Sequence, residues 1–365
     1  MPHLLVSISG HGFGHIAQTG PVLNALRQRL PDLRLTVVST APEFKLRQRI
    51  DGDFALHPRT WDFGFVMEDA FRIDRKASAR AYREFHANWE ERVAEEAEWI
   101  AAQQPDLVLA NAAYLPLAAA SRLGLQAFGM SSLNWADLFR FVFGEADGDR
   151  EQDGDWAKPI HTQMLASYNS ARAFLKLAPG MAMPDLAQGR WIGPVARIGR
   201  ERGMELRQRL GIPDHTRLVL AALGGIPSRV PVQDWPATPQ VHWLVPSAWQ
   251  AQRPDMTAFE PLGWDFTDLL ASVDGLLGKP GYGTFAETAC NGTPMLYARR
   301  EDWPEQDALI PWLQQYGCCK EVDEALFQTG ALSAPLAALW EQPRPTPPKP
   351  DGAEAAAQLL AAALA

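Results

Sequence analysis

Hydrophobic runs alternate with helical patterns along the first half of the chain. Apolar runs at residues 4–9 and 33–39 flank a segment, residues 22–30, in which valine and leucine recur at helical spacing. A strand, a loop, a helix and a second strand of these lengths form a unit with two parallel strands. The alternation continues with a helix expected at 78–103, a strand at 106–110, a helix at 117–123 and a strand at 126–130. This pattern predicts an α/β doubly wound domain.

The pattern breaks near residue 180 and then starts again. Residues 179–200 contain proline and glycine with little periodicity, which is typical of a linker. The second alternation predicts strands at 217–223, 241–245, 275–278 and 294–298, and helices at 205–210, 268–272 and 284–291. We therefore expect an N-terminal domain at 1–190, a C-terminal domain at 191–350, and a terminal helix at 351–365 that returns to the N-terminal domain. Ligands of such sheets bind beyond the carboxyl ends of the strands, so a site is expected between the domains.

Composition narrows the class of protein. Of the 365 residues, 47% are hydrophobic and 21% are charged, which indicates a globular chain, and the formal net charge of −9 argues against a nucleic-acid partner. The three cysteines lack the spacing of a disulfide framework or a zinc site, so no metal is expected and a reduced, cytoplasmic protein is predicted. The first ten residues lack a signal-peptide pattern, and no apolar stretch is long enough for a transmembrane helix. A peripheral membrane contact stays open, because a linear sequence does not show which apolar side chains gather on a surface.

The loop after the first predicted strand, residues 10–15, reads GHGFGH. Gly12 and Gly14 allow the backbone to approach a ligand closely, and the helix that follows offers unpaired amides to an anion. The spacing is not that of a dinucleotide fingerprint, and no acidic residue follows the second strand. His15 is favoured over His11 as a base that takes a proton from an acceptor hydroxyl. The alternative for His15 is a structural histidine that caps the helix or forms a hydrogen bond with the end of the sheet.

A second glycine-rich turn, GKPGYGT at residues 278–284, precedes a helix in the C-terminal half. Its amides and the Thr284 hydroxyl can cradle a diphosphate, and Glu287 can accept hydrogen bonds from a ribose diol. Thr284 and Glu287 also match a capping box, which is the structural alternative. Glu305 and Gln306 follow the next strand, where they can bond sugar hydroxyls or simply form a solvated turn.

These stretches resemble a known family. Residues 9–26 and 268–309 are similar to the first loop and the donor-site motif of GT-B glycosyltransferases, in particular inverting enzymes similar to the undecaprenyl-pyrophosphoryl-muramoylpentapeptide N-acetylglucosaminyltransferase. GHGFGH, GKPGYGT and residues 106–135 resemble still more closely the GT-B-like N-terminal portion of L-arabinokinases, whose kinase half has no counterpart here. The resemblance implies a GT-B fold, in which two Rossmann-like parallel-sheet domains face each other across a cleft.

The resemblance also assigns roles to individual residues. His15 falls on the catalytic base, while Asn111 stands where many relatives carry an aspartate that supports this histidine. An asparagine can orient an imidazole but cannot stabilise its cation, which puts the base and the transfer activity in question. The donor-binding positions implied by the likeness, or expected beside them, are Gly12, Gly14, Gly224, Gly225, Phe266 (at the nucleobase), Lys279, Gly281, Tyr282, Gly283, Thr284, Glu287 (at the ribose), Arg300, Glu305 and Gln306 (at the donor sugar).

The function expected from the residues and the resemblance together is an inverting glycosyltransferase. It would move a hexosyl or N-acetylhexosaminyl group from a nucleotide-sugar, expected to be a UDP-sugar, to an acceptor that the sequence does not identify. Lys279 or Arg300 and a helix dipole would offset the charge of the leaving diphosphate, so no metal or other cofactor is expected. Two alternatives stay open, namely a non-hydrolysing sugar-nucleotide epimerase that uses Glu305 with His11, and a non-catalytic sugar-nucleotide-binding protein.

Overall fold

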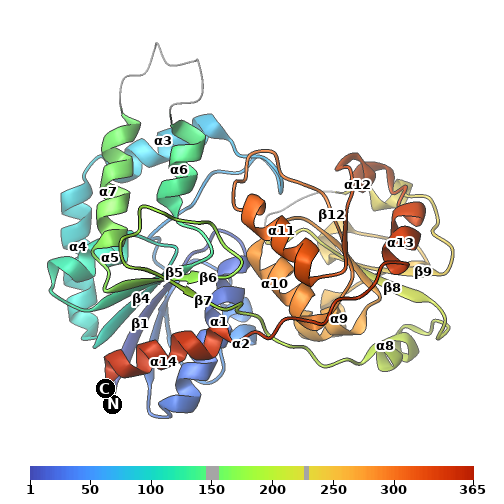
Figure 1. Ribbon diagram of the computed structural model, residues 1–365, viewed down its shortest axis with the longest axis horizontal. Coiled ribbons are helices and arrows are strands. Elements are labelled where there is room, and N and C mark those ends of the chain that lie inside the picture. The colour runs from blue at the N-terminus through green and yellow to red at the C-terminus, as the bar shows by residue number, and fades with distance from the viewer. Residues whose placement is uncertain (145–155, 226–229) are drawn as a thin grey trace.

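The computed structural model describes residues 1–144, 156–225 and 230–365 of the chain. These residues form two lobes that lie side by side, each built on a parallel sheet with helices on its faces (Figure 1). All six residues of β1 (His3–Ile8) are buried. Strands that are apolar on both faces are covered by helices on both sides, so both sheets lie inside the lobes rather than facing water. Across the described residues, every helix is too short or too polar to span a bilayer.

The N-terminal lobe holds the larger sheet. Its described strands lie in the order β3-β2-β1-β4-β5-β6-β7, and all pairs are parallel. The elements are β1 (His3–Ile8), α1 (Gly14–Arg29), β2 (Arg34–Val38), α2 (Glu43–Arg49), β3 (Ala55–His57), α3 (Arg75–His86), α4 (Trp89–Gln103), β4 (Leu107–Asn111), α5 (Leu115–Arg122), β5 (Ala127–Ser131), α6 (Trp135–Phe143), α7 (Ala157–Asn169), β6 (Ala173–Leu177) and β7 (Gly189–Ile192).

The C-terminal lobe repeats the same architecture with the strand order β10-β9-β8-β11-β12-β13 in the described residues. Its α-helices and strands are α8 (Gly203–Leu210), β8 (Arg217–Ala222), β9 (Val241–Val245), β10 (Met256–Ala258), α9 (Phe266–Ser272), β11 (Gly275–Gly278), α10 (Tyr282–Asn291), β12 (Met295–Tyr297), α11 (Gln306–Tyr316), β13 (Cys319–Glu321), α12 (Ala325–Thr329) and α13 (Ser333–Trp340). Short 3₁₀ turns lie at Val232–Asp234, Ser247–Trp249 and Glu260–Leu262.

Two predicted features differ in the structure. The helix expected at 78–103 is two helices, because Asn88 leaves the helical conformation and the His86 ring stacks on Trp89 at 4.8 Å while bonding the Tyr114 hydroxyl. The expected linker at 179–200 contains the edge strand β7, whose central residues Arg190 and Trp191 are exposed. A strand of four residues that buries one side chain leaves little periodic signal in the sequence.

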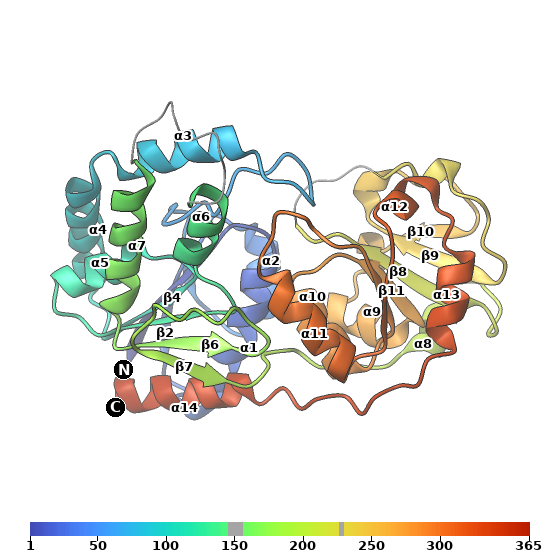
Figure 2. The same cartoon turned by 45° about the horizontal axis from the view of Figure 1, so that its top comes forward.

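The chain ends on the lobe where it began. Helix α14 (Gly352–Leu364) packs against α1, and the segment that leads to it runs back from α13 along the molecule (Figure 2). Ala356, Ala357 and Leu360 of α14 are fully buried in the core that also contains β1 and α1. The Gly352 amide donates to the Pro194 carbonyl at 3.0 Å, which fixes the start of the helix against the segment that joins the lobes.

Several contacts hold the two lobes together. One apolar core runs from the N-terminal sheet through α1 and α10 into the C-terminal sheet. Phe71, from the loop between β3 and α3, lies in the C-terminal core with its ring 5.8 Å from that of Phe327. The neighbouring Arg72 forms an ion pair with Glu324 at 2.8 Å. The two lobes are therefore in contact at several places.

Candidate functional site

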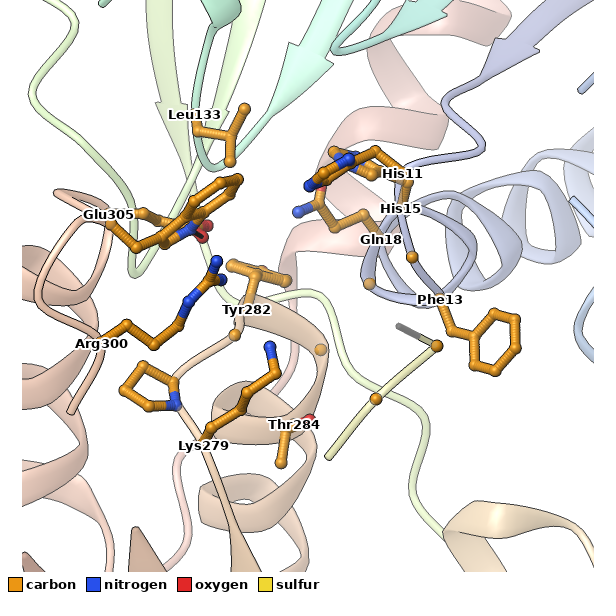
Figure 3. A pocket seen from close by; sticks show the side chains of 18 of the residues that line it. His11, Phe13, His15, Gln18, Leu133, Lys279, Tyr282, Thr284, Arg300 and Glu305 are labelled. Atoms are coloured by element: carbon orange, nitrogen blue, oxygen red, sulfur yellow. Dashed lines mark hydrogen bonds between the residues drawn. The ribbon is translucent and has the colours of Figure 1, made fainter. Parts of the chain in front are cut away.

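A cavity of about 100 Å³ lies between the two glycine-rich loops (Figure 3). It is formed by the carboxyl end of β1 and the start of α1 on one side, and by the ends of β8 and β11 and the start of α10 on the other. Twelve of the predicted site residues line it: Gly12, Gly14, His15, Gly224, Gly225, Lys279, Gly281, Tyr282, Gly283, Thr284, Arg300 and Glu305. Loops separated by some 260 residues in the sequence thus meet at one place.

Two of the glycines have backbones that favour glycine. Gly12 has a φ of 81° and Gly224 a φ of 84°, a region that side chains with a Cβ rarely adopt. A Cβ added to Gly225 would lie 3.0 Å from the Phe13 ring of the opposite loop. Glycine at position 225 therefore lets the two loops approach each other more closely than a larger residue would allow.

His15 is held by Asn111 at the end of β4. The two side chains join through His15 Nδ1 and Asn111 Oδ1 at 2.7 Å, and both residues are buried. An amide oxygen only accepts, so a ring that faces Asn111 Oδ1 carries its proton on Nδ1 when the Asn111 amide has this orientation. Burial lowers the pKa of His15 to about 4, although the bond to Asn111 opposes this change. The imidazole is therefore neutral at physiological pH.

His11 shares the cavity with His15. Its ring stacks on Trp303 at 5.6 Å and meets Trp135 edge to face at 5.4 Å. Burial, followed by the nearby positive charges, lowers the pKa of His11 to about 3, so this ring is also neutral. Its Nε2 atom is buried without a hydrogen-bond partner in the described residues. The sequence ranked His11 below His15, yet both rings lie at the site.

The start of α10 packs directly against the start of α1. A Cβ on Gly283 would lie 2.8 Å from Ala17 Cβ and 3.5 Å from Gly14 Cα, so the two helix N-termini lie side by side. The Tyr282 hydroxyl accepts a hydrogen bond from the Val195 amide at 2.8 Å and donates to the Ala178 carbonyl at 3.2 Å. Tyr282 thus lines the cavity with its ring and ties the lobes together with its hydroxyl.

Two cationic side chains point into the cavity (Figure 3). Burial, followed by repulsion from Arg300, lowers the pKa of Lys279 to about 7. Burial likewise lowers the pKa of Arg300 to about 10, and its Nη2 atom has no hydrogen-bond partner among the described residues. The Arg300 guanidinium, with Nη2 available, and the partly protonated Lys279 lie beside two helix N-termini, and together they form an environment that favours an anion.

Glu305 is the acidic side chain of the cavity. Its two carboxylate oxygens accept from Ser132 Oγ at 2.6 Å and from Trp303 Nε1 at 3.0 Å. Burial raises the pKa of Glu305, against these bonds and the nearby charges of Arg300 and Lys279. Ser132 belongs to the N-terminal lobe, so this bond crosses the cleft.

Four predicted site residues lie outside the cavity lining. Asn111 is behind His15, as described, and Phe266 begins α9 with its ring 6.4 Å from Phe259. Gln306 folds back on its own loop, where its amide accepts from the Arg300 amide at 2.9 Å and donates to the Arg300 carbonyl. The Glu287 carboxylate pairs with Arg49 of α2 at 2.5 Å. Phe266, Gln306 and Glu287, expected at the nucleobase, the sugar and the ribose, thus each have a partner within the protein.

Some residues at the site carried no signal in the sequence. Gln18, Leu133 and Trp303 line the cavity. Asp62, from the loop after β3, is buried behind it and accepts from Ser9 Oγ at 2.8 Å and Trp135 Nε1 at 2.6 Å. Burial raises the pKa of Asp62 to about 6. These side chains come from separate elements without a shared spacing, so the fold alone brings them together.

Comparison with known proteins identifies the fold. No protein-family model matches the chain. The chain is 26% identical over 320 residues to L-arabinokinase of Arabidopsis thaliana, a match that covers 86% of this chain but only 30% of that protein. The likeness to L-arabinokinase expected from the sequence is thus confirmed.

Solved structures agree on the architecture. The glycosyltransferase of kitacinnamycin superposes with a TM-score of 0.58 at 15% identity, covering 100% of this chain and 95% of that one. A UDP-N-acetylglucosamine 2-epimerase, so described, from Listeria monocytogenes superposes with a TM-score of 0.55 at 14% identity, covering 99% and 95%. At such identities the likeness concerns the fold, and it confirms the two facing Rossmann-like domains expected from the sequence. The chain has the GT-B fold.

Proposed function

We propose that the chain is an inverting glycosyltransferase that uses a nucleotide-sugar, with a UDP-sugar as donor. The observation that carries the proposal is the cavity itself, where a neutral histidine from one lobe meets the basic side chains of Lys279 and Arg300 from the other. In an inverting transfer, a base takes the proton of the acceptor hydroxyl while the donor diphosphate leaves from the opposite side of the sugar carbon. The N-terminal lobe would supply the base, and the C-terminal lobe would supply the positive charge for the leaving diphosphate.

His15 is the proposed base. Its Nδ1–H is committed to Asn111, and Nε2 forms no hydrogen bond with the described residues. A base with a pKa of about 4 is weak at neutral pH, and general-base catalysis is most effective when the pKa lies near the working pH. A bound diphosphate would raise the pKa of His15, because a nearby negative charge favours the imidazolium. Donor binding would therefore strengthen the base at the time when it is needed.

Lys279, Arg300 and the two helix N-termini are the proposed diphosphate site. They would hold the donor phosphates and stabilise the charge that develops on the leaving group. Thr284 and the loop amides at 281–283 would add hydrogen-bond donors. The proposed reaction needs no metal, because these groups provide the positive charge in its place.

The cavity is small for a complete donor. About 100 Å³ compares with the roughly 300–1,000 Å³ of typical small-molecule sites. It suits the phosphates, while the nucleoside and the sugar need further space in the cleft. Glu287 would reach a ribose once its ion pair with Arg49 opens. The described arrangement therefore represents a closed form, and donor entry would require the lobes to separate.

Calorimetric titration with nucleoside diphosphates tests the proposal. We expect UDP to bind and Lys279→Ala to weaken binding by at least about tenfold, since it removes a buried charge-assisted contact. Lys158→Ala, which removes an exposed lysine on α7, is the matched control and should bind as the wild type does. His15→Ala should retain binding and lose transfer by about 10²–10⁴-fold. If no nucleoside diphosphate binds the wild-type chain, the proposal fails.

A sugar-nucleotide epimerase is the second candidate. It is favoured by the presence of His11 and Glu305 in the same cavity and by the epimerase among the similar folds. Incubation of UDP-sugars with the protein, without acceptor, should leave the sugar unchanged in NMR spectra if the chain is a transferase. Appearance of a C2 epimer would favour the second candidate, and binding without either reaction would favour a non-catalytic sugar-nucleotide-binding protein.

A further inference from the structure

A continuous chain of buried hydrogen bonds joins the proposed base to a carboxylate on the opposite lobe. His15 Nδ1 bonds Asn111 Oδ1 at 2.7 Å, and Asn111 Nδ2 donates to Gln18 Oε1 at 2.9 Å. Gln18 Nε2 donates to Ser132 Oγ at 2.8 Å, and Ser132 Oγ donates to Glu305 Oε1 at 2.6 Å. Each of these five residues is at most 5% exposed, so water does not interrupt the chain.

The direction of the chain follows from its acidic end. An ionised carboxylate only accepts, so Ser132 must donate to Glu305 and must itself accept from the Gln18 amide nitrogen. The Gln18 oxygen then faces Asn111, whose nitrogen donates to it. Asn111 is left with its oxygen toward His15, so Nδ1 must carry the histidine proton. Each donor along the chain therefore points from His15 toward Glu305.

The opposite direction would disable the base. If the Glu305 carboxyl group donated to Ser132, each amide could turn over and the Asn111 nitrogen would face His15. Nδ1 would then be unprotonated, and Nε2, the atom left free for an acceptor, would carry the proton. Trp303 Nε1 donates to Glu305 at 3.0 Å, and the charges of Lys279 and Arg300 lie nearby. These groups favour the ionised, accepting form of Glu305, against burial, which raises its pKa.

We propose that Gln18 and Ser132 are positioning residues that transmit the charge of Glu305 to His15 and hold it in the tautomer with Nε2 free. The catalytic meaning of this chain rests on the proposed function. This chain of hydrogen bonds takes the place of a carboxylate in direct contact with the histidine. It is needed because the adjacent Asn111 is neutral, and its amide group has no preferred orientation of its own. Glu305 belongs to the C-terminal lobe, so the base is oriented only while the lobes are together.

The tautomer can be measured without any activity. We would record nitrogen-15 NMR spectra of the protein with its eight histidines labelled, and assign His15 by the signals lost in His15→Gln. The wild-type chain should show Nδ1 protonated and Nε2 bare. Glu305→Gln preserves the shape but allows the terminal group to donate, and Ser132→Ala breaks the chain. Both variants should show a mixture of tautomers.

Ser131→Ala is the matched control. Ser131 Oγ also bonds Gln18 Oε1, at 3.1 Å, but lies to one side of the chain, so its removal should leave the wild-type tautomer. A wild-type spectrum with Nε2 protonated would overturn the proposal, as would an unchanged tautomer in both Ser132→Ala and Glu305→Gln. Because Glu305→Gln is isosteric, it keeps the test decisive if Ser132→Ala does not fold.

Kinetics provide a second readout if transfer is found. Ser132→Ala should lower kcat by at least about tenfold, within the 10²–10⁴-fold contribution of a general base, and leave the KM for the donor near its wild-type value. Ser132→Thr retains the hydroxyl and should recover most of kcat. Equal effects of both substitutions on kcat would contradict the positioning role. A protein without transfer activity would refute the proposed function, and the NMR spectra would still show which tautomer His15 adopts.

Discussion

The bond between His15 and Asn111 sets the chemistry of the site at the scale of single residues. Asn111 accepts from the imidazole at 2.7 Å without contributing a charge, and burial lowers the pKa of His15 to about 4. In the proposed transfer, stabilisation of the imidazolium must therefore come from elsewhere in the cavity. A bound substrate and the carboxylate of Glu305 are two sources of negative charge that the arrangement allows.

Replacing Asn111 with aspartate tests this view of the base. A carboxylate in contact with Nδ1 favours the imidazolium, so Asn111→Asp should raise the pKa of His15 by about 1–3 units from its value near 4. Because the base acts in its neutral form, activity of the variant should be lost at a correspondingly higher pH as the solution is made acidic. NMR titration of His15 and the acid limb of the kcat/KM profile measure the two effects. An unchanged pKa would show that Asn111 does not control the ring.

Part of the residue chemistry was predictable from the sequence. The resemblance pointed to His15 with Asn111, and the structure joins these two side chains directly. Gln18 and Ser132 were not foreseen, because a glutamine within a helix and a serine after a strand have no distinctive spacing. Gln306 was expected at the sugar, but its amide bonds the backbone of Arg300, a choice that depends on loop conformation.

The two helix N-termini are the central feature at the scale of elements. Helices α1 and α10 begin in glycine-rich loops on different lobes and meet where Gly283 lies against Ala17. Their unpaired amides and dipoles converge on one cavity, which explains why two separate sequence motifs both pointed to an anion. The sequence predicted each strand–loop–helix unit, since its apolar pattern is local. Their close packing depends on small residues from opposite lobes, which no local pattern describes.

A methyl group at this contact should separate the helices. Gly283→Ala would place a Cβ 2.8 Å from that of Ala17, and overpacking of this kind costs roughly 1–3 kcal/mol. We expect a lower melting temperature and weaker UDP binding. Gly281→Ala meets no atom within 4 Å, so it should melt like the wild type.

Removal of the opposing methyl group should reverse the effect. Gly283→Ala combined with Ala17→Gly should be more stable than the sum of the two single changes predicts, because the clash is absent. Thermal melting of the four proteins in this cycle gives the coupling directly. Strict additivity would mean that the two helices do not touch in solution.

At the scale of the whole molecule, contacts at several points hold the two lobes together. Tyr282 bonds the segment that joins the lobes, Phe71 inserts into the C-terminal core, and Arg49 pairs with Glu287. The doubly wound halves and their order were evident from the sequence pattern. The sequence pattern did not show how closely the lobes approach each other, because this depends on ion pairs between residues more than 200 positions apart, such as Arg49 with Glu287.

Loss of Arg49 should open the molecule. The Glu287 side chain is 2% exposed, and removing one partner of a buried ion pair costs about 3–5 kcal/mol. Separation of the lobes would hydrate it, so we expect Arg49→Met to increase the radius of gyration measured by small-angle X-ray scattering. Arg47→Met on the same helix is the control, since Arg47 forms an exposed pair with Glu43. Equal radii of gyration for both variants and the wild type would show that the ion pair does not hold the lobes together.

The most direct test of the central claim is a crystal structure of the wild-type protein with UDP bound. We predict that the phosphates lie between the two glycine-rich loops, within hydrogen-bond distance of Lys279 Nζ and Arg300 Nη2, with His15 Nε2 facing the space beside the terminal phosphate. The Arg49–Glu287 pair should be open, with Glu287 free for the ribose. A nucleotide bound away from these loops, or a cavity that stays empty at saturating UDP, would contradict the account.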